Sequence, residues 1–197
     1  YGTVSRYGVV AMASSTDVAG PLATTVADAA LVYDVFAGQD PLDSTTIVRD
    51  PAGYSNGLDT TVKGKKIGVI TEYMGDALDP AVHAQIVAAT DKLRAAGAEI
   101  TEVSLPSLVL ALAIYYIVVP AEISSNLARH DGQRYSFSAA AGSKDLQDSY
   151  SQSRSIGFGK EAKRRIMIGT YVLSSGYYDA YYKRAQTART KLINEFS

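Results

Sequence analysis

The most constraining feature of the sequence is a strand–helix–strand pattern at about residues 65–105. The segments KKIGVIT and AEITEVSL at its two ends are short apolar runs with β-forming residues. Between them, Asp79 and Pro80 form a typical helix start, apolar residues recur at helical spacing, and Gly97 ends the pattern. Short connections of this kind join parallel strands of one sheet, so the chain is predicted to have an α/β fold.

Four further helices are predicted from apolar residues at helical spacing: from Thr24 or Thr25 to Gly38, about 108–128, 159–173 and 175–196, the last capped by Ser175. Residues 39–63 are predicted to form a long irregular connection, and 130–158 carry no clear pattern. The apolar run from 108 to 119 is too short to span a bilayer as a helix, which favours a buried core helix.

Composition narrows the classes of function. The net charge of −1 argues against a protein that binds nucleic acid through many phosphates, and the absence of cysteine excludes disulfides and thiolate nucleophiles. No signal peptide is visible. Because the chain starts at Tyr1 in the middle of a pattern, we expect it to be a piece of a longer protein.

Familiar catalytic and ligand-binding motifs are missing. The segment IGFGKE resembles a phosphate loop only loosely, since Arg154 and Glu161 replace the residues that such a loop needs. The two histidines are far apart, so no metal site is predicted; His83 is expected to be exposed on a helix. His130 beside Asp131 is either a loop histidine satisfied by a neighbour or an acid–base pair.

Two serine pairs, Ser14–Ser15 and Ser174–Ser175, are poor candidates for a nucleophile. A catalytic serine needs an adjacent base and usually a tight glycine turn that offers N–H groups to an oxyanion. Neither pair has that turn.

Arg165 is the most informative charged residue. On the helix predicted at 159–173 it falls within the arc formed by Ala162, Ile166, Gly169, Val172 and Leu173. A half-buried guanidinium needs an acceptor, so Arg165 either forms an internal ion pair with Asp or Glu or clamps the carboxylate of a substrate. In the apolar helix, one of Tyr115 and Tyr116 is expected to pack and the other to point its hydroxyl at a cavity.

The segment SSGYYDAYYKR (174–184) combines tyrosines with basic residues. One interpretation is a surface that stacks on nucleic acid; the other is the packed seam of an amphipathic helix. Tyr177 and Tyr181 align with apolar residues further along, and the basic residues mostly lie elsewhere on the circumference. The spacing therefore favours packing.

Three stretches make the chain resemble a known family: residues 1–45, YYIVVPAEISSNLARHDGQRYS (115–136) and GFGKEAKRRIMIGTYVLSSGYYDAYYKRAQTAR (157–189). They resemble amidase-signature enzymes, and within these the A subunits of glutamyl-tRNA(Gln)/aspartyl-tRNA(Asn) amidotransferases. The resemblance covers 1–197 and implies a partial α/β domain with a mixed, twisted sheet flanked by helices, and with family segments missing on both sides.

The resemblance implies that this segment carries substrate contacts but no catalytic residue. The family's serine nucleophile, second serine and lysine lie in glycine-rich serine motifs and an upstream lysine segment, and this chain contains no Gly-Gly pair. Arg165 matches the position that holds the α-carboxylate of glutamine, and Tyr115 matches a pocket tyrosine. The parent is expected to be a cytoplasmic, non-membrane glutaminase subunit of a heterotrimer, whose partner subunit binds ATP, Mg²⁺ and most of the tRNA.

The sequence departs from the family pattern at Thr24, at Thr16-Asp17-Val18 and at His130. Two alternatives to the amidotransferase subunit also stay open. One is a fragment of a stand-alone amidase that acts on small amides, and the other is a non-catalytic interaction or RNA-binding module.

Overall fold

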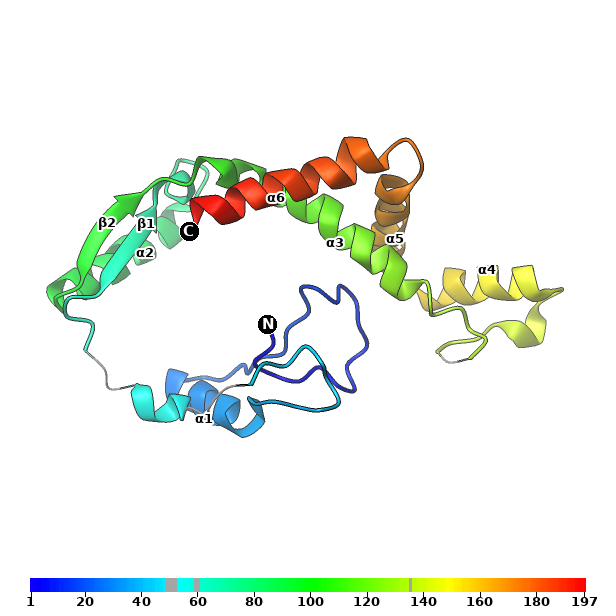
Figure 1. Ribbon diagram of the computed structural model, residues 1–197, viewed down its shortest axis with the longest axis horizontal. Coiled ribbons are helices and arrows are strands. Elements are labelled where there is room, and N and C mark those ends of the chain that lie inside the picture. The colour runs from blue at the N-terminus through cyan, green and yellow to red at the C-terminus, as the bar shows by residue number, and fades with distance from the viewer. Residues whose placement is uncertain (49–52, 59–60, 135) are drawn as a thin grey trace. The chain divides into compact units, whose positions relative to one another are not determined.

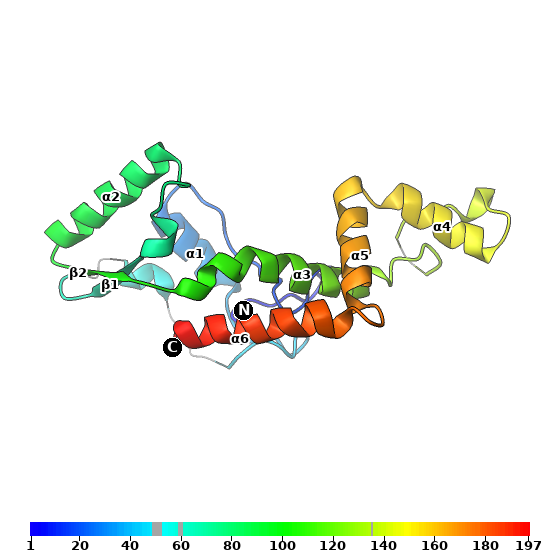
Figure 2. The ribbon, with the colours of Figure 1, turned by 90° about the horizontal axis from the view of Figure 1, so that it is seen from above.

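The computed structural model describes residues 1–48, 53–58, 61–134 and 136–197. They form two compact units, one made of Tyr1, 6–18 and 111–190, and the other of 2–5, 19–110 and 191–197. Figures 1 and 2 show the elements of both. Residues 49–52 and 59–60 of the predicted irregular connection, and Tyr135, lie outside the described residues.

The predicted strand–helix–strand unit is confirmed. Strands β1 (Lys66–Ile70) and β2 (Glu99–Val103) are parallel, with Ile67 opposite Ile100, and α2 (Pro80–Ala95) connects them (Figure 1). Gly97 has a φ of +92°, which suits the turn back to the sheet because glycine has no Cβ. The expected α/β class is therefore confirmed, and in the described part of the chain the sheet has these two strands.

The start of α2 is set by its N-cap. The Asp79 carboxylate accepts from the backbone N–H groups of Ala81 and Val82, at 2.8 and 3.3 Å, and Pro80 occupies the first turn, where no N–H is needed. These bonds satisfy donors that have no partner inside the helix.

Replacing Asp79 with alanine is expected to lower the free energy of unfolding by about 1 kcal/mol, because the two N–H groups lose their acceptor. Urea denaturation followed by circular dichroism measures the change. Asp76→Ala is the matched control, since Asp76 is exposed and precedes the helix. Equal losses in the two variants would contradict the capping role.

The helix α1 (Val26–Phe36) belongs to the same unit. Thr25 caps it by accepting from the Asp28 N–H at 3.1 Å, as predicted, and none of its residues is buried. Near its end, Asp34 accepts from the side chain and N–H of Ser55 and from the Tyr54 N–H, at 2.6–3.0 Å. The Ser55 hydroxyl is the largest of the effects that hold the pKa of Asp34 below its usual value. These bonds join α1 to the 3₁₀ turn η1 (Tyr54–Gly57).

In the other unit, α3 (Ala111–Leu127) packs most extensively against α5 (Lys160–Leu173) (Figure 2). Buried residues of α3 include Ile114, Val118, Pro120, Ala121 and Ile123. Gly169 is buried on the facing side of α5, where an added Cβ would lie 2.7 Å from the Ser124 Cβ. The close approach depends on that missing atom. Residues 130–158, which carried no clear pattern, include η4 (Ala140–Gly142) and α4 (Leu146–Gly157).

By length and composition alone, the helical stretch Pro106–Leu127 could cross a membrane, since it has 22 residues and a mean hydropathy of 1.9. The sequence expectation concerned only the uninterrupted apolar run of residues 108–119, and the helical stretch that contains this run is longer. Core helices of soluble proteins pass the same test, and 44% of the apolar window is buried within the chain. The finding is weak support for a membrane span.

The predicted last helix differs from the expectation. Its first part is a π-helical segment, η5 (Tyr178–Lys183), and α6 (Arg184–Glu195) follows. Ser175 does not cap it: Tyr177 is the N-cap residue, without a side-chain bond, and Gly176 has a φ of +85°. The extra residue in the π turn shifts the phase of the residues around it, so counting 100° per residue fails across this segment.

Candidate substrate-binding site

The packing of α5 against α3 positions Arg165. Arg165 lies one turn before Gly169, where the two helices approach closely, and the predicted apolar face of α5 is confirmed by the burial of Gly169 and Val172. Its side chain is 20% exposed, whereas that of the neighbouring Arg164 is 70% exposed. Arg165 therefore lies half-buried at the edge of the helix pair.

The guanidinium of Arg165 binds one residue on each helix. Nε donates to Glu161 Oε1 at 2.7 Å, one turn earlier on α5, and Nη1 donates to the Tyr115 hydroxyl of α3 at 2.9 Å. The bond to Tyr115 first, and then the bond to Glu161, raise the pKa of Arg165. The predicted internal ion pair is thus present, with Glu161 as the partner that sequence reasoning did not name.

Two tyrosine rings line the same guanidinium. Its central carbon lies 5.7 Å from the ring centre of Tyr115 and 5.8 Å from that of Tyr116, and the two rings meet edge to face at 5.3 Å. One of the two tyrosines was expected to pack; the rings pack on each other, but neither is buried, since they are 42% and 46% exposed. Consecutive residues point 100° apart on a helix, so both lie at the margin of the buried face of α3.

This arrangement can still bind an anion. Of the five N–H donors of an arginine, two are used by Glu161 and Tyr115, which leaves three. The outer edge formed by Nη1 and Nη2 matches a carboxylate with two parallel hydrogen bonds, and the Tyr115 hydroxyl keeps its own proton to donate. The Glu161 carboxylate, whose pKa Arg165 lowers most, offsets part of the charge.

The loop at residues 12–17 carries the first serine pair and is tied to α3. The N–H of Ser15 donates to Glu122 Oε2 at 3.0 Å, and its hydroxyl donates to the same carboxylate. Asn126 Nδ2 donates to the Met12 carbonyl and to the Ser14 hydroxyl, each at 3.2 Å. None of these contacts supplies the imidazole or amine that would activate a serine. The structure therefore supports an anchoring role.

The other predicted candidates lie apart from Arg165. The Ser174 hydroxyl donates to the Tyr171 carbonyl at 2.7 Å and ends α5. The His130 ring contacts Phe158 edge to face at 6.4 Å, while Asp131 accepts from the Gln133 N–H at 2.9 Å. In the part of the chain that the structure describes, no group of three or more His, Cys, Asp or Glu side chains could hold a metal ion.

The residues at which the sequence departs from the family pattern have ordinary local surroundings. The Thr16 hydroxyl donates to the Ala13 carbonyl at 3.1 Å, and the Asp17 carboxylate accepts from the Met12 N–H at 2.8 Å. Val18 and Thr24 are exposed. These positions are not brought into contact with Arg165 by any hydrogen bond or ion pair among the described residues.

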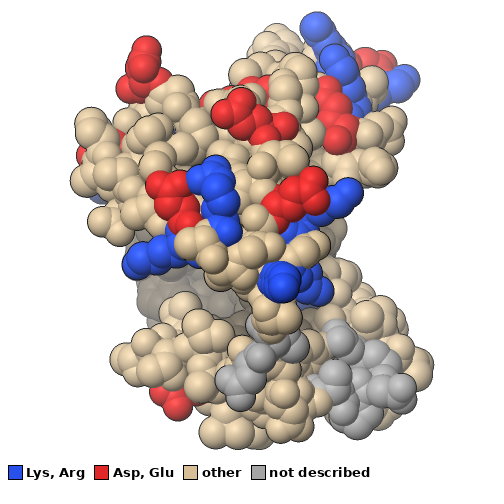
Figure 3. Space-filling model, turned by 90° about the vertical axis from the view of Figure 1, so that its left-hand side faces the viewer, with Lys and Arg blue, Asp and Glu red and all other residues tan. Residues whose placement is uncertain are grey.

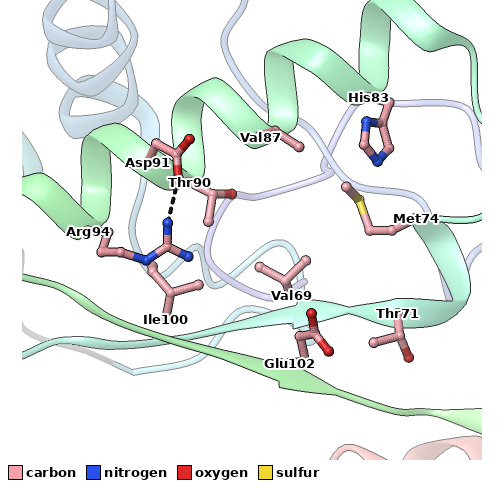
Figure 4. A pocket seen from close by; sticks show the side chains of 10 residues that line it. All are labelled: Val69, Thr71, Met74, His83, Val87, Thr90, Asp91, Arg94, Ile100 and Glu102. Carbon is pink, nitrogen blue, oxygen red and sulfur yellow. Dashed lines mark hydrogen bonds and ion pairs between the residues drawn. The ribbon is translucent and has the colours of Figure 1, made fainter.

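A separate cavity of about 310 Å³ lies between α2 and the two strands. Figure 4 shows His83 and Met74 at one end of it, and Asp91 bonded to Arg94 at the other. His83 is therefore half-buried at a cavity, where it was expected to be exposed. Apolar side chains alternate in its lining with polar ones that carry both signs of charge, which points to no single chemistry.

The comparisons with known proteins agree in one family. Residues 1–197 match the profile of the family described as Amidase. The A subunit of the glutamyl-tRNA(Gln) amidotransferase of Koribacter versatilis (strain Ellin345) is 52% identical over 196 residues, which cover 100% of this chain and 41% of the relative. The chain thus spans about two fifths of the length of the curated relatives that it matches.

Solved structures of amidases and amidotransferase subunits are also similar to this chain. The crystal structure of the glutamyl-tRNA(Gln) amidotransferase A subunit from Thermotoga maritima is 35% identical, with a TM-score of 0.71, over 99% of this chain and 37% of that one. The native peptide amidase from Stenotrophomonas maltophilia is 29% identical, with a TM-score of 0.57, over 94% of this chain and 38% of that one.

Proposed function

The chain belongs to the amidase family, and from this premise we propose that it is a segment of the glutaminase subunit of a tRNA-dependent amidotransferase. The whole protein hydrolyses glutamine through an acyl-enzyme. The ammonia then amidates Glu-tRNA(Gln) or Asp-tRNA(Asn) on a partner subunit. Identities of 50 to 52% to proteins named as this subunit favour it over other amidases.

The contact between Arg165 and Tyr115 is the observation that carries this proposal. The two residues are 50 positions apart, and each was assigned to the substrate pocket by its own sequence motif. Their hydrogen bond of 2.9 Å places a cation with free N–H groups beside a tyrosine hydroxyl. Such a pair holds the α-carboxylate of glutamine and leaves the side-chain amide for the nucleophile.

This segment contains substrate-binding residues but not the groups that carry out catalysis. The serine nucleophile, the second serine and the lysine belong to another part of the whole protein, since the chain has no glycine-rich serine motif. ATP and Mg²⁺ act in the partner subunit, where the tRNA is also mainly bound. The assembly is a cytoplasmic heterotrimer, and this segment contributes substrate binding only.

A stand-alone amidase is the second candidate, favoured by the similarity to the peptide amidase from Stenotrophomonas maltophilia. A third is an RNA-binding or other non-catalytic module. Two observations argue against the RNA-binding module. Basic and acidic side chains are interspersed on the side drawn in Figure 3, and Tyr171, Tyr177 and Tyr181 pack on one another with ring centres 4.4–6.0 Å apart.

The tyrosines of SSGYYDAYYKR are thus engaged with each other, as a packed seam would be, but they are not buried. Tyr177, Tyr178 and Tyr181 are each more than 40% exposed. Their inward orientation was predicted from a regular α-helix, which the π turn interrupts. The Tyr171 side chain forms a hydrogen bond with the Tyr177 side chain. This bond is the largest of the effects that raise the pKa of Tyr171 to about 12.

Steady-state kinetics of the whole protein test the function. Glutamine is expected to be the preferred amide, with a kcat/KM at least about a hundredfold above those of acetamide and of a C-terminal peptide amide, because only glutamine offers the α-carboxylate to Arg165. The isolated 197-residue chain serves as the inactive control. Faster turnover of simple amides would assign the protein to the stand-alone amidases, and activity of the isolated chain would refute the absence of a nucleophile.

A further inference from the structure

A cavity of about 330 Å³ lies beside the loop at 12–17, within the unit that holds α3 and α5. Its walls include Ser14, Glu122, Asn126, Leu173, Tyr178 and Tyr182. These residues come from the loop, from α3, from the end of α5 and from η5. The volume falls at the lower end of the range of small-molecule sites and is several times that of a water molecule.

The cavity carries one formal charge. Glu122 is the single carboxylic acid among its described walls, and no lysine or arginine lines it. The carboxylate accepts from the N–H and the hydroxyl of Ser15, and forms no ion pair with any described residue. A carboxylate has about four lone-pair sites, so it can accept further bonds. An uncompensated carboxylate in a cavity favours a cation.

The rest of the cavity wall is aromatic and apolar. Tyr178 and Tyr182 lie one turn apart on the π-helical segment, with ring centres 5.2 Å apart, and Leu173 adds apolar surface. Ring faces attract ammonium groups, and together with Leu173 they also contact alkyl groups favourably. Asn126 and Ser14 supply polar atoms beside the carboxylate. The walls thus divide into an anionic and polar part and an aromatic and apolar part.

We propose that this cavity binds a small alkylammonium compound, with the ammonium group at Glu122 and the alkyl chain against Tyr178, Tyr182 and Leu173. A free ammonium ion would occupy only a small part of the volume and leave the apolar wall without a contact. The site is distinct from Arg165, whose charge selects anions. It does not depend on the function proposed above.

Isothermal titration calorimetry of the whole protein with n-butylammonium chloride tests the site. Saturable binding is expected, with n-butanol and ammonium chloride each at least about tenfold weaker, because each lacks one half of the recognition. The two controls also separate the sources of binding. Equal affinity for n-butanol would show an apolar pocket without charge recognition, and equal affinity for ammonium chloride would show a site for the ion alone; either result overturns the proposal.

Two variants locate the binding. Glu122→Gln keeps an oxygen that accepts from Ser15 but removes the charge that the ammonium group bonds to, and it is expected to weaken n-butylammonium binding about tenfold. Tyr182→Leu leaves the bonds between Ser15 and Glu122 in place and is expected to weaken binding about threefold. Glu102→Gln, at the separate cavity beside α2, is the matched control and should have no effect. Unchanged binding by Glu122→Gln, with an unchanged melting temperature, would place the ligand elsewhere.

Discussion

Replacing Gly169 with alanine is expected to lower the free energy of unfolding by at least about 3 kcal/mol, or to prevent folding of the unit. A Cβ at this position would lie 2.6 Å from the carbonyl carbon of Pro120 and 2.7 Å from the Ser124 Cβ, and it would overlap the Pro120 carbonyl oxygen. These are mostly backbone atoms of α3, so no side chain can rotate away. Relief requires α3 and α5 to separate.

The matched control is Gly142→Ala, because Gly142 is exposed and an added Cβ would contact nothing within 4 Å. Its unfolding free energy should stay within about 0.5 kcal/mol of the original. Guanidinium chloride denaturation monitored by circular dichroism measures both variants. If Gly169→Ala were as stable as Gly142→Ala, the close packing of α3 against α5 would be wrong, and so would the placement of Arg165 beside Tyr115.

Replacing Arg165 with lysine in the whole protein is expected to raise the KM for glutamine about tenfold or more, with kcat changed less than about threefold. An ammonium group retains the charge but lacks the planar edge that donates two parallel bonds to a carboxylate. A hydrogen bond to a charged group contributes about 1.5–3 kcal/mol, and tenfold in KM corresponds to about 1.4 kcal/mol. A KM effect with little change in kcat indicates that the interaction is present before the transition state.

Arg164→Lys is the control for this prediction, since Arg164 bonds to the same Glu161 but its side chain is 70% exposed. Its kinetics should match those of the original protein. If the KM of Arg165→Lys were unchanged, Arg165 would not bind the carboxylate of the substrate. If both variants raised KM equally, the cause would be their shared partner Glu161 or a loss of stability of α5. Melting temperatures of both variants separate the last two cases.

Local sequence signals predicted most of the elements. Asp79-Pro80 and Gly97 bounded α2 correctly because capping and turn preferences act within a few residues. The same holds for Thr25 at the start of α1. The prediction failed at residues 175–183, where the change to a π turn depends on packing that no local preference describes.

The candidate site was predictable in part. Helical periodicity placed Arg165 at a half-buried position, and its partner Glu161 could have been found from the spacing of four residues on one helix. The family resemblance assigned Arg165 and Tyr115 to one substrate pocket, but their hydrogen bond was seen only in the structure, since periodicity does not reveal which residues meet across 50 positions. The half-exposure of Tyr115 and Tyr116 was missed because both lie at the margin of the buried face.

By itself, the sequence determined the α/β class, the ends of most helices and the half-buried position of Arg165, because these depend on hydrogen bonds and periodicity within one element. Only the tertiary structure decided which elements meet: Gly169 with Pro120, Arg165 with Tyr115, and Ser15 with Glu122 across 107 positions. Such contacts depend on how closely two backbones approach and which side chains then fill the space. Neighbours along the chain do not specify either.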